Sequence, residues 1–283
     1  MQRERLLLAA LLVICVVQGR RVKKNSSRIR AAACGDMLES KDAIVAAEHF
    51  LSTGQSASER ACWERAAELD EDNHTPLVRL GNMAHVDGKL ESARSLLEQA
   101  RMLAPSDSYV HSSIAGIEYS GKRFHLAVIH YQLALSVPGG LTVHNLNNLG
   151  ISYSAVKDWS GAERTYRLAL RLWGERSRGA QGASLPTSAV SVSAALHVQQ
   201  AQAQQLASHA VSVMLNLGNA YVETRRFSDA TQVYQHMLRL APAYAVGHYS
   251  LGRAYDRARD SSKALRSYQR ALDFDPHLPN AYR

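Results

Sequence analysis

Side chains able to carry out chemistry are plentiful in this chain, but their spacing matches no catalytic pattern. Twelve histidines are present, and no two of them have the HExxH spacing that puts a zinc ion and a general base on one helix face. The glycines form neither GxGxxG nor GxxxxGKS/T, the loops that cradle nucleotide phosphates. No serine lies in a nucleophile elbow. The sequence therefore predicts no enzyme and no cofactor.

Two other groups have atoms that bind metals or form cross-links. The acidic run at 70–72 has the charge to bind a cation, but it falls between two predicted helices, where a solvated turn is the simpler explanation. The three cysteines, Cys15, Cys34 and Cys62, show no CxxC or metal spacing. An odd number without a pattern predicts no disulfide framework. We expect Cys62 to pack as a small buried hydrophobe, and we expect no metal site.

The elements that must position these side chains are helices. Hydrophobic residues make up 46% of the chain and charged residues 20%, which fits a folded body. Alanine, leucine, glutamine, glutamate and arginine are frequent, and these side chains lose little rotamer freedom in a helix. At 283 residues, the chain has room for one large domain or two ordinary ones.

A register of small and aromatic residues repeats every 34 positions. Gly218 and Gly252 are 34 residues apart, and each is followed by an alanine, a tyrosine and a closing proline at matching distances. These followers are Ala230, Tyr234 and Pro242 in the first unit and Ala264, Tyr268 and Pro276 in the second. A fixed period of this length indicates a repeat protein. The predicted units are 40–73, 74–107, 108–142, 143–176, 211–244 and 245–278, followed by the start of a further helix.

The residue types suit helices packed in pairs. Glycine and alanine are small where two helices approach closely, and the tyrosines fill the gaps between helices. Proline ends the second helix of a unit, because it disfavours helix in the residue before it. The unit at 108–142 shows a one-residue irregularity around Gly116 and Tyr119. No single unit buries its apolar face alone, so the units must stack.

This register resembles the tetratricopeptide-repeat family, whose unit is a helix–turn–helix of 34 residues. The match covers most of residues 40–283. The resemblance implies an all-α fold, a right-handed α-α superhelix of about six helix pairs. In this family the first helix of each unit lines a concave groove that receives extended peptides or helices. It therefore implies a non-catalytic scaffold or adaptor for peptide or protein partners.

By register, the resemblance places eight side chains in the groove: Asn82, His85, Tyr119, His144, Asn147, Asn219, Tyr249 and Arg253. Asparagine amides can bond a peptide backbone of any sequence, and Arg253 can pair with a carboxylate. The clamp that some members close on the C-terminal carboxylate of chaperones is not predicted. Val78, Gly116 and Ile151 occupy positions where that clamp needs lysine, asparagine and arginine.

Two alternative functions remain open. The stretches 146–150 and 215–218 are similar to repeats of protein glycosyltransferases, which implies a substrate-recognition arm of a glycosyltransferase-like protein. The N-terminal segment allows a membrane-anchored import or chaperone receptor.

Residues 174–210 interrupt the register. They contain glycines, a proline and many serines, followed by a run rich in glutamine and alanine. We expect a low-complexity loop and then one helix that leads into the next unit. The interruption divides the repeats into a first block at 40–173 and a second block at 211–283, whose relative orientation is then free to vary.

Residues 1–33 have the pattern of a targeting segment. A basic start precedes the apolar run Leu6–Val17, and a basic cluster follows at 20–24. A secretory signal cleaved after Gly19 fits this pattern. A short membrane anchor flanked by cations also fits, and an organelle transit peptide is the third alternative. We expect a secretory or membrane-anchored protein, with residues 1–24 as the signal or anchor and the orientation left open.

The charge of the chain is concentrated at its N-terminus. The formal net charge is +8, from 33 basic and 25 acidic residues. Residues 1–33 hold eight basic groups and one acidic group, which leaves 25 and 24 for the remainder. A nucleic-acid binder would carry its charge on the folded surface, so we expect no nucleic-acid partner.

The last five residues begin another unit and stop. Repeat proteins normally close with a polar cap. The sequence leaves two explanations: a truncated chain, or an open face for a partner or for self-association.

Overall fold

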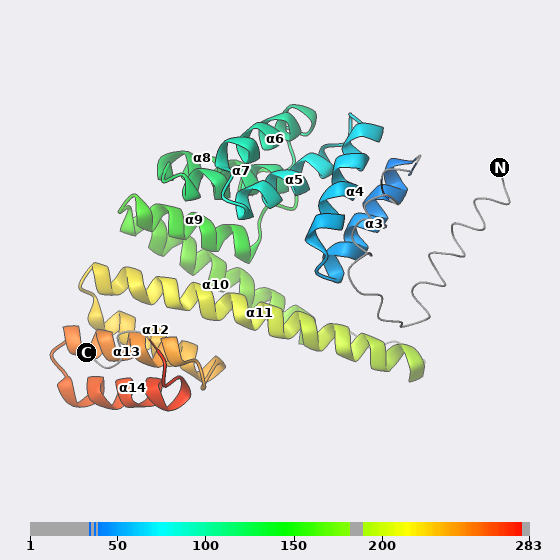
Figure 1. Cartoon of the computed structure of the whole chain (residues 1–283). Coiled ribbons are helices and arrows are strands. Elements are labelled where there is room, and N and C mark those ends of the chain that lie inside the picture. The colour runs from blue at the N-terminus through cyan, green and yellow to red at the C-terminus, as the bar shows by residue number, and fades with distance from the viewer. Residues whose placement is uncertain (1–33, 35–36, 38, 182–188, 279–283) are drawn as a thin grey trace.

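The structure is a computed structural model of the chain that describes residues 34, 37, 39–181 and 189–278 (Figure 1). Twelve helices, α3 to α14, make up this described part, and they pack as six consecutive pairs. The bounds are α3 Ser40–Ser52, α4 Ser56–Leu69, α5 His74–Val86, α6 Leu90–Leu103, α7 Ser108–Ser120, α8 Phe124–Ser136, α9 Val143–Ala155, α10 Trp159–Gln181, α11 Ala189–Glu223, α12 Phe227–Leu240, α13 Ala245–Arg257 and α14 Ser261–Phe274. The predicted all-α fold of about six helix pairs is confirmed.

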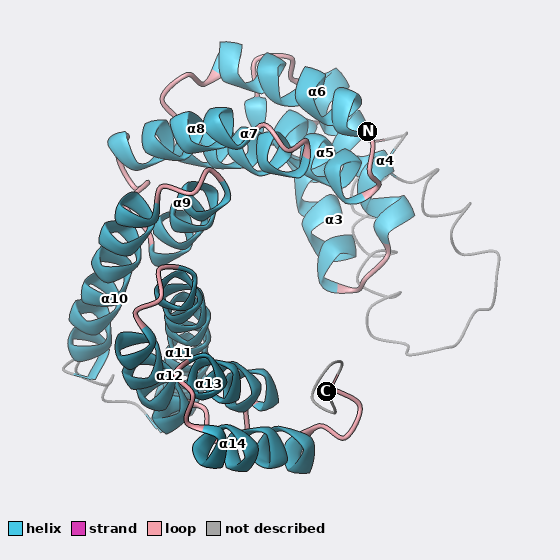
Figure 2. Ribbon diagram, turned by 90° about the vertical axis from the view of Figure 1, so that its left-hand side faces the viewer, coloured by secondary structure: helices cyan, strands magenta, loops and turns pink. Residues whose placement is uncertain are grey.

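The helix pairs form a curved array. In Figure 2 the first helices of the pairs lie on the inner side of the curve, and α6, α8, α10 and α14 lie on the outer side. Some successive first helices also contact one another: α5 contacts α7, and α11 contacts both α9 and α13. The described helices include none that is both long and apolar enough to cross a membrane.

A turn of three residues joins the two helices of every pair. The middle residue of each turn has a positive φ, between 59° and 76°, in the left-handed region. These six residues are Gly54, Gly88, Lys122, Lys157, Arg225 and Arg259. The repeated conformation brings the second helix of each pair back against the first.

The small residue of the register lies where the two helices of a pair come closest. A Cβ atom on Gly218 would lie 2.3 Å from the ring of Tyr234, so only glycine fits there without movement. In the third pair, buried Ala115 holds this position against Tyr131. The irregularity predicted around Gly116 is therefore wrong. The extra residue of this unit lies in the connection at 137–142, which has six residues where the preceding connections have four.

The interruption has more helix than the sequence indicated. Helix α10 continues to Gln181 instead of ending near 173, and α11 begins at Ala189 and runs without a break to Glu223. One hydrophobic cluster extends from Val143 to Ala254, so it joins the two blocks. A shared core of this kind opposes the free variation in their orientation that the sequence suggested.

The prediction of no disulfide is wrong for one pair of cysteines. Cys34 and Cys62 are joined by a disulfide, with their Cα atoms 5.1 Å apart. Both are buried beside Ala47 and Trp63. Because the partners are separated by 28 residues, no local spacing pattern announces the bond. Cys15 and the targeting segment at 1–33 lie outside the described residues.

Candidate partner-binding surface

The eight predicted groove residues all lie on first helices. Asn82 and His85 are on α5, Tyr119 on α7, His144 and Asn147 on α9, Asn219 on α11, and Tyr249 and Arg253 on α13. Seven are partly buried, and His144 is exposed. They are distributed over five helices on the inner side of the curve, so they form an extended surface and not one pocket (Figure 2).

Three of the asparagines are held by hydrogen bonds to neighbouring side chains. Tyr234 donates its hydroxyl to Oδ1 of Asn219 over 2.8 Å, from the second helix of the same pair. Asn216 donates to Oδ1 of Asn147 over 3.0 Å, across the junction between α9 and α11. Both Asn147 and Asn219 thus have their carbonyl oxygen occupied and their NH2 group available as a donor.

Asn82 has the opposite arrangement. Its Nδ2 donates to the hydroxyl of Tyr109 on the next first helix over 3.1 Å. The side-chain carbonyl oxygen of Asn82 is therefore the atom left to accept a bond. The inner surface consequently offers an acceptor at α5 and donors at α9 and α11.

Burial of the register tyrosines keeps their hydroxyls protonated. Burial raises the pKa of Tyr131 and of Tyr166 to about 12, and it raises the pKa of Tyr234 as well. Tyr234 is thus a neutral hydroxyl at physiological pH and has a proton to donate to Asn219. This hydrogen bond fixes the orientation of the side-chain amide of Asn219.

The remaining predicted residues differ in whether their side chains already contact other side chains of the protein. His85 bonds Ser120 of α7 over 2.6 Å, and His144 bonds Asn148 over 2.9 Å. The ring of Tyr119 packs 5.2 Å from Phe124, between the helices of its own pair. The ring of Tyr249 similarly packs 5.6 Å from that of Tyr268. Within the described residues, Arg253 forms no ion pair, so its guanidinium is free to meet a carboxylate.

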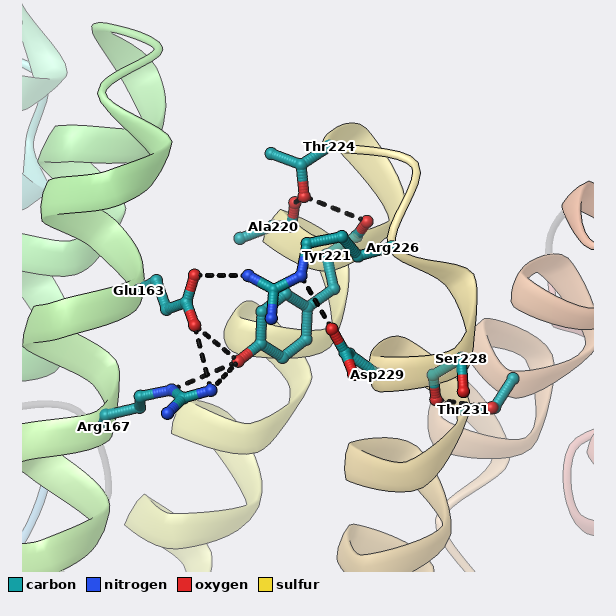
Figure 3. A network of polar contacts seen from close by, with 9 residues as sticks. All are labelled: Glu163, Arg167, Ala220, Tyr221, Thr224, Arg226, Ser228, Asp229 and Thr231. Atoms are coloured by element: carbon teal, nitrogen blue, oxygen red, sulfur yellow. Dashed lines mark hydrogen bonds and ion pairs between the residues drawn. The ribbon is translucent and has the colours of Figure 1, made fainter.

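A polar network that the sequence did not indicate joins α10 to α11 and α12 (Figure 3). Arg226 donates to Oε2 of Glu163 over 2.7 Å, and Tyr221 donates to Oε1 of Glu163 over 3.0 Å. Arg167 in turn donates to the hydroxyl of Tyr221 over 3.0 Å. A cavity of about 250 Å³ lies beside this network and is lined in part by Trp159, Glu163 and Arg226. These hydrogen bonds and ion pairs therefore link the second block to the first.

The equivalent position of α7, α9 and α13 makes such a contact with the preceding pair, as Tyr221 of α11 does. Tyr153 accepts from Gln132 over 2.7 Å, and Tyr255 accepts from Gln235 over 2.8 Å. At this position α7 carries a buried glutamate, Glu118, which pairs with Arg94 on α6 over 3.3 Å and also with Arg123. The 34-residue register would have revealed this position, because Glu118 stands where the three later repeats have Tyr153, Tyr221 and Tyr255.

The described ranges include no cluster of three metal-binding side chains. The acidic run at 70–72 lies in the connection between α4 and α5, as predicted. A cavity of about 450 Å³ is lined by His74, Asp107 and residues of the connections, and none of the eight predicted residues lines it.

Comparisons with known proteins agree with this architecture. Two family models described as tetratricopeptide repeat match residues 213–245 and 245–278. PilW, a type IV pilus biogenesis factor, is similar with a TM-score of 0.65 and 12% identity, covering 92% of this chain and 98% of PilW. YrrB, a repeat protein with an unusual peptide-binding site, has a TM-score of 0.54 and 15% identity, covering 78% of this chain and 95% of YrrB.

A third structure, PilF of Pseudomonas aeruginosa, has a TM-score of 0.54 and 17% identity, covering 75% of this chain and 80% of PilF. No curated protein sequence matches the chain. The fold and the extended inner surface define an α-solenoid of stacked helix pairs, the scaffold type on which partners are held along a surface. Residues 213–278 are tetratricopeptide repeats, and the described helices as a whole form a tetratricopeptide-like solenoid.

Proposed function

We propose that this protein is a non-catalytic scaffold that binds an extended peptide along the inner surface of its first helices. The observation that carries the proposal is the pair of oriented amides on α9 and α11. Asn147 and Asn219 each have the carbonyl oxygen engaged by the protein and the NH2 group available. Amide donors at a fixed spacing suit the backbone carbonyl oxygens of an extended chain, whatever its side chains.

Arg253 supplies the charged part of the proposed site. It lies on α13, one helix beyond Asn219, and is partly buried. An arginine in this setting forms bidentate hydrogen bonds with a carboxylate. The favoured ligand is therefore an extended peptide with an acidic residue, or a free C-terminal carboxylate, placed at α13.

The test starts from a displayed library of random peptides, from which binders are resynthesised and their Kd measured with the full chain. Asn219→Ala combined with Arg253→Ala should weaken binding at least about ten-fold, since each removes a hydrogen bond to the ligand. The matched control is Gln232→Ala with Arg239→Ala, two exposed residues of α12, which is the second helix of its pair. Equal Kd values for the two double variants would sink the proposal.

We also propose that the folded body lies outside the cytosol, in the secretory pathway or attached to a membrane. The buried disulfide between Cys34 and Cys62 supports this proposal, because disulfides form and persist where thiols are oxidised. Protease digestion of intact cells or vesicles, together with the mass of the N-terminus, provides the measurement. Repeats that are digested on the cytosolic side would overturn the proposal.

A further inference from the structure

The turns within the helix pairs share one backbone conformation and, in four of six cases, one charge. Their middle residues all have a positive φ, and glycine fills the first two turns. Lysine or arginine fills the other four: Lys122, Lys157, Arg225 and Arg259. Apart from glycine, asparagine and aspartate adopt this conformation most readily. Backbone preference therefore does not select lysine or arginine, and the shared property of the four residues is their charge.

None of these four basic side chains forms an ion pair with another described residue. Other basic residues of the turns are engaged, as Arg123 is with Glu118 and Arg226 is with Glu163. The four middle residues are all exposed, and none of them lies in an ion pair within the part of the chain that the structure describes.

The acidic residues of the same turns are occupied. Asp87 pairs with Arg60 over 2.8 Å. Asp158 accepts from the backbone N–H of Gly161 over 2.9 Å, and Asp260 pairs with Lys263 over 2.6 Å. The free charge of this edge is therefore positive.

The four cations follow one another along one edge of the molecule. The turns between α7 and α8, α9 and α10, α11 and α12, and α13 and α14 lie in a row on the left-hand side of Figure 1. Figure 2 views this edge from the front. Packed helices lie about 8–10 Å apart, and α9, α11 and α13 contact one another in succession, so their turns follow at about this spacing.

The two edges of the array have opposite charge. The six turns within pairs contain seven basic and three acidic residues, a net charge of 7 − 3 = +4. The described connections between pairs, at 70–73, 104–107, 137–142 and 241–244, contain four acidic residues and no lysine or arginine, a net charge of −4. The body is nearly neutral as a whole, so its positive charge is segregated on one side.

We propose that this basic edge docks onto the face of a membrane that points away from the cytosol, where that leaflet carries anionic lipid headgroups, in line with the location proposed above. Neither cavity described above is lined by any of the four cations, so they do not converge on a small anion. A row of single charges on turn tips suits a broad anionic surface that meets many tips at once. The sequence of residues 1–33, with its apolar run and basic cluster, makes a membrane the anionic surface expected nearby.

The expected strength follows from the number of cations. Each basic residue held close to an anionic bilayer strengthens binding by about five-fold, so four together contribute about several hundred-fold. Salt should weaken this contribution, because exposed charges are screened beyond about 10 Å at moderate ionic strength.

The test measures binding of the full chain to phosphatidylcholine vesicles with and without phosphatidylglycerol. The variant replaces all four residues with asparagine, which tolerates the left-handed conformation: Lys122→Asn, Lys157→Asn, Arg225→Asn and Arg259→Asn. It should lose roughly a hundred-fold or more of the binding that depends on phosphatidylglycerol. The matched control removes four exposed charges from second helices: Arg164→Gln, Arg171→Gln, Arg239→Gln and Arg270→Gln. It should bind as the parent does.

Two further variants keep the result interpretable. Exchanging lysine for arginine and arginine for lysine at the four tips preserves charge and should preserve binding. Glycine at the four tips removes the charge without backbone strain. The glycine variant should therefore show the same loss of vesicle binding, and it serves as the test if the asparagine variant folds poorly. The segment at 1–33 is present in every variant, so its own membrane affinity cancels in the comparison.

Equal binding by the asparagine variant and the matched control would overturn the proposal, because charge in general would then explain the affinity. Binding of the parent and of each variant to poly-glutamate is also measured in solution, without vesicles. A four-tip variant that loses poly-glutamate binding but keeps vesicle binding would also overturn the lipid assignment and would point to an acidic polypeptide. Neither result depends on the amides of the inner surface, so the proposed peptide-binding function is tested separately.

Discussion

The junction between α6 and α7 and the junction between α10 and α11 connect neighbouring helix pairs with different chemistry. At the first, Glu118 is only 7% exposed and lies between Arg94 and Arg123. At the second, Glu163 is 24% exposed and pairs with Arg226, while Tyr221 takes the position that Glu118 holds in α7. The first junction buries a charge, and the second buries a phenol and keeps its charges near water.

This difference determines how much each ion pair contributes. A buried carboxylate has lost its hydration and depends on its partners for compensation. A carboxylate near the surface remains hydrated, and its pairs contribute little to stability. The two junctions should therefore respond very differently to the loss of a partner, although they occupy equivalent places in the repeat.

The largest effect is expected from stranding the buried carboxylate. Arg94→Ala combined with Arg123→Ala leaves Glu118 without a cation and should lower the free energy of unfolding by about 3–5 kcal/mol. Urea denaturation followed by circular dichroism measures the loss. Adding Glu118→Gln to this variant should restore part of it, because the buried charge is then gone. A loss below about 1 kcal/mol would show that Glu118 is hydrated and that the two junctions are alike.

An intermediate loss of stability is expected at the small residue of the first helix that packs against the tyrosine of its own pair. In α7 this residue is Ala115, and in α11 it is Gly218. Gly218→Ala would place a Cβ atom 2.3 Å from the ring of Tyr234, so it should cost about 1–3 kcal/mol. The control is Gly174→Ala in α10, where nothing lies within 4 Å of the new atom. That substitution should stabilise the helix by about 0.5–1 kcal/mol, and thermal melts would separate the two signs.

The smallest effect is expected at the exposed junction. Glu163→Gln removes the carboxylate that pairs with Arg226, and the free energy of unfolding should fall by less than about 1 kcal/mol. The loss should shrink further in high salt. A cost comparable with that of the stranded Glu118 would mean that the network of Figure 3 acts as a cooperative unit.

Much of the fold could be predicted because the repeat encodes the same contact many times. Gly218 and Tyr234 recur as Gly252 and Tyr268, and the structure packs each pair together. The helix class, the number of pairs and the identity of the first helices follow from this spacing. The ends of α10 and α11 did not, because no repeated partner marks them.

The helices that carry the candidate binding residues were predicted, but the hydrogen bonds of these residues were not. The register assigned Asn147 and Asn219 to first helices, and they lie there. It gave no indication that Asn216 and Tyr234 would engage their carbonyl oxygens. The predicted role of these residues in binding a partner remains a prediction until the variants are measured.

The sequence by itself determined that this protein is a stack of helix pairs, because a 34-residue period of small, aromatic and proline residues can bury its apolar faces only by stacking. Tertiary structure alone decided which distant groups meet. It joined Cys34 to Cys62, surrounded Glu118 with two arginines, and aligned Lys122 and Arg259 on the same edge. These contacts depend on how successive helix pairs pack in space. The separation of two residues along the sequence does not by itself give the distance between them in the fold.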